Sequence, residues 1–118
     1  MELCAAFAED GCVPTGGARV STAPLHTGFL GTCSAAFARA PGACALVHYD
    51  ETQPGMHARA EACAAAFARA HGRAPWCVVR GARAAASVGG VERALVSAGV
   101  RSLPCGVGAS ARVTPDAP

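Results

Sequence analysis

The sequence predicts an α+β fold, with a compact β-sandwich or mixed sheet flanked by helices. The length of 118 residues suffices for a single domain, residues 1–118, with one modest core. Hydrophobic residues make up 52% of the chain and charged residues 15%, which is typical of a folded protein. Short apolar runs separated by turns fill the first half, whereas helix-like and strand-like segments alternate in the second.

The first half of the chain predicts short strands bounded by glycine and proline. Glu9-Asp10-Gly11 ends the first strand, and Pro14-Thr15-Gly16-Gly17 has the composition of a turn. Pro41-Gly42 predicts a hairpin turn between two consecutive strands. The predicted strands cover residues 2–8, 18–22, 34–40 and 43–49, with an extended connection at 24–31 and a solvated loop at 50–55.

In the second half the hydrophobic period becomes that of helices. Residues 56–70 are rich in alanine, glutamate and arginine, and the helix that they predict ends at His71-Gly72. Its apolar face carries residues spaced by three or four: Met56, Ala60, Cys63, Ala64 and Phe67. Further elements are predicted as a strand at 76–80, a helix at 90–98, and short strands at 100–105 and 111–114. Residues 81–88 fit either a loop or a helical turn.

Because much of the apolar content is alanine, the core depends on a small number of large side chains. The main candidates are Leu3, Phe7, Leu30, Phe37, Leu46, Val47, Phe67, Trp76, Val78, Val79, Val91, Leu95, Val100 and Leu103. The seven cysteines contain no C-x-x-C pair and no zinc-finger spacing, and an odd number cannot all form internal disulfides. Free cysteine often packs as a small hydrophobic residue. We therefore expect a reduced, cytosolic chain in which all cysteines but one are packing residues.

The charge pattern argues against nucleic-acid and membrane partners. The formal net charge is +2, and the ten basic residues, all arginine, are scattered along the chain. Charges or glycines interrupt every apolar run before it reaches the roughly 18 residues that a membrane span needs. The start, Met1-Glu2-Leu3-Cys4, has neither the basic nor the long apolar segment of a conventional secretion signal.

One segment of the chain has the residue types that a thiol hydrolase needs. In Thr27-Gly28-Phe29-Leu30-Gly31-Thr32-Cys33, the cysteine follows two glycines, where the backbone can turn and leave the thiol exposed. His48 follows Cys33 by fifteen residues, in a predicted neighbouring strand. A nearby imidazolium favours the reactive thiolate, and the histidine can return the proton to the leaving amine. Gly31 lets the backbone bend, so that the amides of Thr32 and Cys33 can bind an oxyanion.

The same segment resembles the T-x-x-L-G-S-C signature of the chemoreceptor glutamine deamidases, the CheD family. The resemblance implies that Cys33 is the nucleophile, His48 the base, and Thr27 the residue that orients the histidine. It also implies the deamidase fold, and the order of the later predicted elements agrees with it along most of the chain. The asparagine that usually precedes the histidine in the family is replaced by Val47.

The interval from Cys33 to His48 is also similar to that in the catalytic domains of cytotoxic necrotizing factor toxins, and Leu30-Gly31-Thr32-Cys33 looks like their L-S-G-C. Those toxins share the fold and deamidate a glutamine in a host GTPase, and in them a backbone carbonyl can orient the histidine. The two resemblances imply two settings. They imply either a cytoplasmic enzyme of bacterial chemotaxis or an effector delivered to a host cell without a conventional signal peptide.

Both resemblances imply the same chemistry, the hydrolysis of a glutamine side-chain amide to glutamate and ammonia through a Cys33 thioester. No metal or organic cofactor is expected, and the partner is a protein substrate, either a chemoreceptor or a host GTPase-like target. Two alternatives stay open: a catalytically inactive binding protein of the same fold, and another cysteine amidohydrolase. His26, next to Thr27, is the competing candidate for the base.

Overall fold

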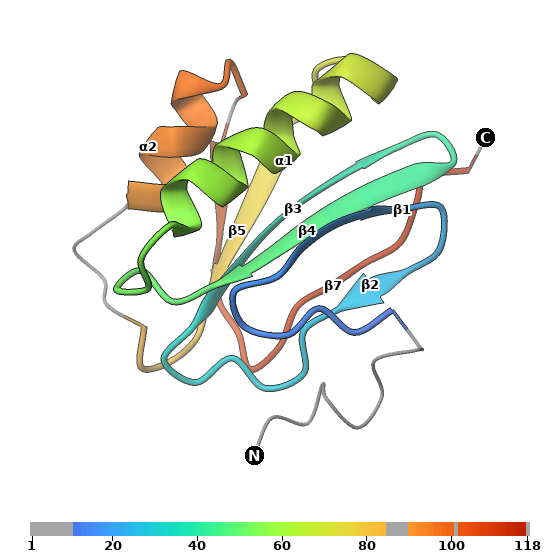
Figure 1. Cartoon of the computed structure of the whole chain (residues 1–118). Helices are drawn as coiled ribbons and strands as arrows, with labels where there is room; N and C mark the ends of the chain where they lie inside the picture. Colours follow the sequence, from blue (N-terminus) through green and yellow to red (C-terminus); the bar gives the residue numbers. More distant parts are fainter. Residues whose placement is uncertain (1–10, 85–89, 101, 118) are drawn as a thin grey trace.

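The computed structural model describes residues 11–84, 90–100 and 102–117, and for residues 102–105 only the backbone. The described part contains seven strands and two helices in an α+β arrangement (Figure 1). The strands are β1 Ala18–Ser21, β2 Leu25–His26, β3 Ser34–Ala40, β4 Ala43–Tyr49, β5 Trp76–Arg80, β6 Ser102–Val107 and β7 Arg112–Val113. The helices are α1 Met56–His71 and α2 Gly90–Ser97.

Five of the described strands form one mixed sheet in the order β1-β4-β3-β5-β6. Neighbouring strands are antiparallel, except that β5 and β6 run parallel. The hairpin of β3 and β4 lies inside the sheet, with Ala40 paired to Ala43 beside the turn and Ser34 paired to Tyr49 at the other end. The turn predicted at Pro41-Gly42 is therefore confirmed, and it sets which residues of the two strands lie opposite each other.

Two layers cover the opposite faces of this sheet. The helices α1 and α2 pack against each other on one face, where α1 lies over β4 and β1 (Figure 1). On the other face, β2 and β7 form an antiparallel pair that packs against β3 and β4. The predicted class, a mixed sheet with helices on the outside, is confirmed for the described residues.

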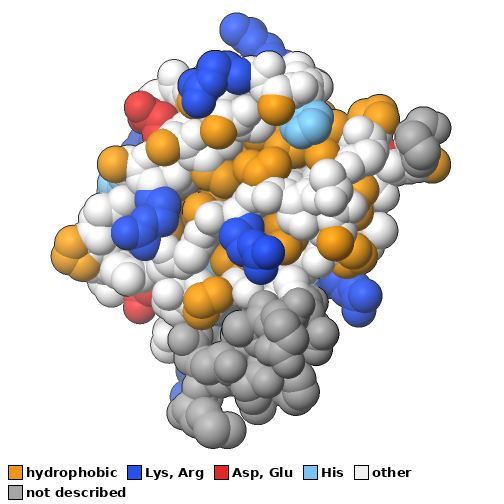
Figure 2. Space-filling model, turned by 45° about the vertical axis from the view of Figure 1, so that its right-hand side comes forward, with side chains coloured by type: hydrophobic (Ala, Val, Ile, Leu, Met, Phe, Trp, Pro, Cys, Tyr) orange, Lys and Arg blue, Asp and Glu red, His pale blue; other side chains and the backbone are white. Residues whose placement is uncertain are grey.

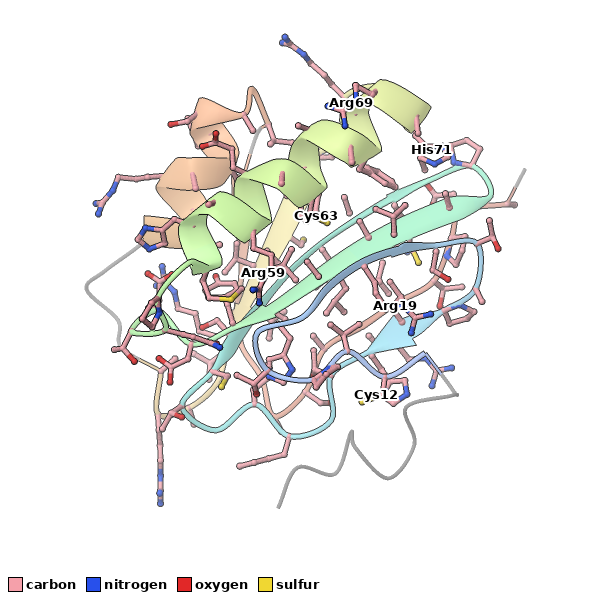
Figure 3. All side chains as sticks on the ribbon, in the orientation of Figure 1. Cys12, Arg19, Arg59, Cys63, Arg69 and His71 are labelled. Atoms are coloured by element: carbon pink, nitrogen blue, oxygen red, sulfur yellow. The ribbon has the colours of Figure 1, made fainter. Side chains whose placement is uncertain are left out.

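The face that α1 turns toward the sheet is the one predicted from its residue spacing. The buried residues of the helix are Met56, Ala60, Cys63, Ala64 and Phe67. Figure 3 shows Cys63 on the side of the helix that faces the sheet. Several strand residues below the helix are alanines, and their small side chains let a helix approach a sheet closely. The larger side chain of Trp76 fills part of the space between helix and sheet, and its ring meets that of Phe67 edge-on at a centroid distance of 6.3 Å.

Strand β4 is buried along its whole length, because layers lie on both of its faces. Ala45, Val47 and their alternate neighbours belong to the core beneath the helices. Cys44 and Leu46 belong to a second core on the side of β2 and β7. The alternation of strand side chains places His48 on this second side. A polar side chain at this position must therefore find its partners inside the protein.

Most of the predicted elements are confirmed, with the boundaries of the strands at β1, β3, β4 and β5 and of both helices correct to within one residue. The predicted connection at 24–31 contains the short strand β2, and β6 continues to Val107. The candidate core residues with described side chains are buried, except that Phe37 and Val79 are partly buried. The predicted strand at 2–8 and the candidates Leu3, Phe7 and Leu103 lie outside the described residues or side chains.

The surface carries dispersed arginines. On the face drawn in Figure 2, most arginine side chains are separated from one another by hydrophobic or uncharged surface. The most exposed large hydrophobic side chains among the described residues include Phe29, which is 70% exposed. Neither described helix is both long enough and apolar enough to cross a membrane.

Candidate active site

Cys33 lies at the end of a tight turn that leads into β3. The turn begins at Leu30, whose carbonyl accepts a hydrogen bond of 2.8 Å from the N–H of Cys33. Within the turn, Gly31 has a φ of 57°, in the left-handed region that favours glycine. The thiol of Cys33 is free and partly buried. The structure thus confirms the glycine turn predicted in front of this cysteine.

Residues 81–83, which follow β5, fix this turn from the side. The N–H of Gly81 donates to the carbonyl of Cys33 at 2.9 Å, and the N–H of Arg83 donates to the carbonyl of Gly31 at 2.9 Å. A Cβ at position 81 would lie 2.3 Å from the Gly31 oxygen and 2.7 Å from the Cys33 oxygen. Only glycine at position 81 therefore allows the two segments to approach this closely.

His48 projects from β4 toward the same side of the sheet as Cys33. In the pairing of β3 with β4 it lies opposite Ala35, two residues after Cys33, and Cys33 packs against Ala35 in one apolar cluster. Side chains in such a diagonal relation on one face of a sheet are within reach of each other. His48 is 1% exposed. The structure therefore brings Cys33 and His48 to one site.

The ring nitrogens of His48 have partners on the segment that precedes β1. Nδ1 lies 2.8 Å from the carbonyl oxygen of Val13. Because a carbonyl can only accept, Nδ1 carries the proton of the neutral ring, and the unprotonated Nε2 faces Thr15. The carbonyl of Val13 thus fixes the tautomer that a general base needs, which is the role of the third member of a catalytic triad.

The hydroxyl of Thr15 lies between the thiol and the imidazole. Its Oγ1 is 3.7 Å from Sγ of Cys33 and 3.4 Å from Nε2 of His48. Within the described part of the chain, hydrogen bonds connect Cys33 to His48 through this hydroxyl and not directly. From the sequence, Thr15 is predicted only as part of the turn Pro14-Thr15-Gly16-Gly17, and its place at the site was not predicted. The one available signal was a hydroxyl residue within a turn that leads into a strand.

Thr27 is not a partner of His48. Its backbone N–H donates to the carbonyl of Ala111 at 3.0 Å, and the N–H of Ala111 donates to its Oγ1 at 3.0 Å. Its hydroxyl donates to the carbonyl of Gly28 at 2.8 Å. Thr27 is buried and connects the approach to Cys33 with the approach to β7. The resemblance to the CheD family implied Thr27 as the partner of the histidine, and the resemblance to the toxins implied a backbone carbonyl. In this structure the partner of Nδ1 of His48 is a backbone carbonyl, that of Val13.

His26, the competing candidate for the base, lies in β2. It pairs with Arg112 of β7 on one side, and its backbone bonds to Gly11 and Val13 on the other. Among the described residues, the structure records no hydrogen bond between the ring of His26 and Cys33. The geometry therefore favours His48 over His26.

The backbone amides predicted to bind an oxyanion differ in their availability. The N–H of Cys33 already donates to Leu30. For the N–H groups of Gly31 and Thr32, the structure shows no acceptor within the described residues, and Thr32 is exposed. The amides of Gly31 and Thr32 are therefore the better placed to meet the oxyanion of a bound substrate.

A pocket of about 480 Å³ opens beside the turn of Cys33. Its lining consists of Phe29, Leu30, Gly31, Thr32, Ala82 and Arg83. The volume lies in the range of ligand-binding clefts. The lining contains the two candidate oxyanion residues, Gly31 and Thr32, but not Cys33, Thr15 or His48.

The loop after His48 is tied to its neighbours, in contrast to the predicted solvated loop. The carboxylate of Glu51 accepts hydrogen bonds from the N–H groups of Gly90 and Val91, at 2.8 and 3.1 Å, where α2 begins. A carboxylate at this end of a helix also interacts favourably with the helix dipole. The hydroxyl and N–H of Thr52 donate to Asp50 and hold the pKa of its carboxyl below the usual value.

The cysteines fall into two chemical classes. Cys12 and Cys77 are disulfide-bonded, so the prediction of a fully reduced chain is wrong. Cys33, Cys44 and Cys63 are the free thiols among the cysteines whose side chains are described. Disulfide formation requires two cysteines to be close in space, which sequence spacing alone does not reveal.

Iodoacetamide at neutral pH is expected to label Cys33 before Cys44 and Cys63, the other free thiols among the described side chains. Burial raises the pKa of the Cys63 thiol to about 11 and also raises the pKa of Cys44, so both stay protonated and shielded. Peptide mass mapping at increasing times measures the order of labelling. Labelling of Cys44 or Cys63 as fast as Cys33 in the folded protein would contradict the structure, and unfolding in guanidinium should make all three equally reactive.

Comparison of the chain with protein-family models and with curated protein sequences finds no match.

Proposed function

We propose that this protein is a protein-glutamine deamidase with Cys33 as its nucleophile and His48 as its general base. The observation that carries the proposal is the set of contacts in which Val13 orients His48 and Thr15 connects His48 to Cys33. Thiol hydrolases pair a nucleophilic thiol with an imidazole whose tautomer is fixed by a third group. Here the third group is the carbonyl of Val13, and the hydroxyl of Thr15 lies between the thiol and the imidazole. The resemblance of the Cys33 segment to glutamine deamidases supports a carboxamide substrate. Together with the layered α+β architecture, it also supports the deamidase fold.

The proposed reaction has two stages. In the first, Sγ of Cys33 bonds to the amide carbon of a glutamine, while the thiol proton passes to His48 and then to the leaving nitrogen. The C–N bond breaks and ammonia leaves. In the second stage, His48 takes a proton from water, the oxygen bonds to the acyl carbon, and the C–S bond breaks. The proton returns to sulfur, and the product is glutamate.

A glutamine on the surface of a protein suits this site better than a free amide. The pocket wall includes the ring of Phe29, which is 70% exposed beside the turn of Cys33. Exposed aromatic side chains are common at protein-binding surfaces, where they supply much of the contact energy. The proposed targets are chemoreceptors and host GTPase-like proteins, the substrates of the families that the Cys33 segment resembles.

The disulfide-bonded cysteines favour one of the two settings. Cys12 and Cys77 are disulfide-bonded, and disulfides persist in oxidising compartments and are rare in the cytosol. An effector that leaves the cell in which it is made meets such conditions, whereas an enzyme of chemotaxis stays in a reducing environment. We therefore favour an exported effector with a GTPase-like target over a chemotaxis enzyme.

The proposal is tested by incubating the purified protein with small GTPases and with the cytoplasmic domains of chemoreceptors. Ammonia release and peptide mass spectrometry of the target measure conversion of glutamine to glutamate. We expect conversion with the wild type and none with Cys33→Ser. A His26→Asn variant is the matched control and should retain the activity, because His26 is not connected to Cys33 by the hydrogen bonds described above.

The same experiment separates the alternatives. Binding of a target without conversion would identify a binding protein of the same fold. Ammonia release from small amides but from none of the proteins would identify another amidohydrolase. Conversion that persists in Cys33→Ser would rule out the proposed nucleophile.

A further inference from the structure

We propose that Thr15 is a catalytic residue whose hydroxyl carries the proton between Cys33 and His48. This inference deepens the proposed function, on which it rests. Its starting point is the placement of the Thr15 hydroxyl, with Oγ1 3.7 Å from Sγ and 3.4 Å from Nε2. Both distances join Thr15 to the atoms that exchange a proton in a thiol hydrolase.

The position of Thr15 is fixed relative to His48 by backbone hydrogen bonds. The N–H of Gly16 donates to the carbonyl of His48 at 2.7 Å, and the N–H of His48 donates to the carbonyl of Gly17 at 3.0 Å. The N–H of Gly17 also donates to the carbonyl of Pro14 at 2.8 Å, which closes a turn around Thr15. The turn that carries the hydroxyl is thus bonded to the same residue that carries the base.

A second element holds the turn from outside. The guanidinium of Arg59 in α1 donates to the carbonyl of Gly16. Figure 3 shows Arg59 at the edge of α1 near the segment that leads into β1. The side chain of Gln53 also lies against Gly16, since a Cβ at position 16 would lie 2.8 Å from its nitrogen. Three segments of the chain therefore hold Thr15 at the site, as expected for a functional group that must be positioned.

The polarity of the hydrogen bonds allows a relay. Nδ1 of His48 is protonated because it donates to Val13, so Nε2 accepts from the Thr15 hydroxyl. The Cys33 thiol then donates to Oγ1. When the thiol ionises, the S–H bond breaks and an O–H bond forms on Thr15. The original O–H bond breaks and an N–H bond forms at Nε2. The products are a thiolate, an intact hydroxyl and an imidazolium.

The relay is tested with Thr15→Val, which keeps the shape of the side chain without its hydroxyl, and with Thr15→Ser, which keeps the hydroxyl. The readouts are the rate at which iodoacetamide alkylates Cys33 at neutral pH and the rate at which p-nitrophenyl acetate acylates it. We expect Thr15→Val to slow both reactions by about tenfold or more, whereas Thr15→Ser stays within about threefold of the wild type. Thermal unfolding verifies that each variant is folded, and Thr15→Ala replaces the valine variant if that one unfolds early.

Two results would overturn the relay. If Thr15→Val reacts as fast as the wild type, the thiol reaches His48 without the hydroxyl. If Thr15→Ser is as slow as Thr15→Val, the methyl group matters and Thr15 acts by packing. Iodoacetamide and p-nitrophenyl acetate react with Cys33 without a target protein. The relay can therefore be tested even if no deamidated target is found. An unreactive Cys33 in the wild type would instead count against the proposed function itself.

Discussion

Replacing His48 by asparagine is expected to remove nearly all of the reactivity of Cys33 toward p-nitrophenyl acetate. The imidazole is the base in the hydrogen-bonded chain that leads from Val13 through Thr15 to the thiol. Without the imidazole, none of the groups in this series of hydrogen bonds accepts the proton of Cys33. The rate of thiol acylation should therefore fall on the order of 10²–10⁴-fold. The rate of nitrophenolate release measures the effect directly.

The double variant gives a sharper form of this test. Residues that act as one catalytic unit lose activity non-additively. The double variant Cys33→Ala/His48→Asn should therefore release nitrophenolate hardly more slowly than Cys33→Ala alone, since Cys33→Ala already lacks the thiol. Independent, multiplying losses would show that His48 acts elsewhere. His26→Asn is the matched control for removal of a histidine from the same side of the sheet, and its rate should equal that of the wild type.

Gly81→Ala is expected to disrupt the site without touching any group that reacts. The new Cβ would lie 2.3 Å from the oxygen of Gly31 and 2.7 Å from that of Cys33, which are backbone atoms that cannot rotate away. The turn of Cys33 must then separate from residues 81–83 and lose the two hydrogen bonds between them. Because displacement of a reacting group by about 1 Å can lower a rate about 10²-fold, we expect a loss of that order in the rate at which p-nitrophenyl acetate acylates Cys33. Overpacking should also lower the free energy of unfolding by about 1–3 kcal/mol.

Gly42→Ala is the matched control for this prediction. Gly42 has a φ of 74°, and a Cβ there would meet nothing within 4 Å, so the substitution adds backbone strain without a steric clash. We expect it to lower the free energy of unfolding by about 1–2 kcal/mol and to leave acylation of Cys33 unchanged. Equal rates in the two alanine variants would show that residues 81–83 do not position the nucleophile.

The sequence predicted the elements whose signals are local. Helix α1 has an apolar face of regular spacing, and the hairpin of β3 and β4 has a turn at Pro41-Gly42 between two apolar runs. Strand β7 was predicted within 111–114, but neither β2 nor the pairing of β2 with β7 left such a signal. Each strand has two residues, and Leu25 pairs with Val113, which is distant from it in the sequence.

Of the candidate site, the proximity of Cys33 and His48 could be predicted from the sequence, whereas the contribution of Val13 and Thr15 could not. Once the hairpin turn pairs Ala40 with Ala43, counting along the strands places Ala35 opposite His48 and Cys33 near by. Val13 and Thr15 reach the site by another route, through the pairing of the segment around β1 with the opposite edge of β4. That pairing joins parts of the chain that are distant in sequence, and Thr27 was expected instead because of a sequence motif alone.

The hydrogen bond from His48 to Val13 has a consequence for how this site can diverge during evolution. The acceptor is a main-chain oxygen, which every amino acid supplies, so no particular side chain at position 13 is required for it. Selection would act instead on the packing that keeps the oxygen in place, since Val13 is fully buried beside Leu25 and Leu46. Relatives could thus differ at position 13 and still orient their histidine in the same way, provided that their chains follow the same path.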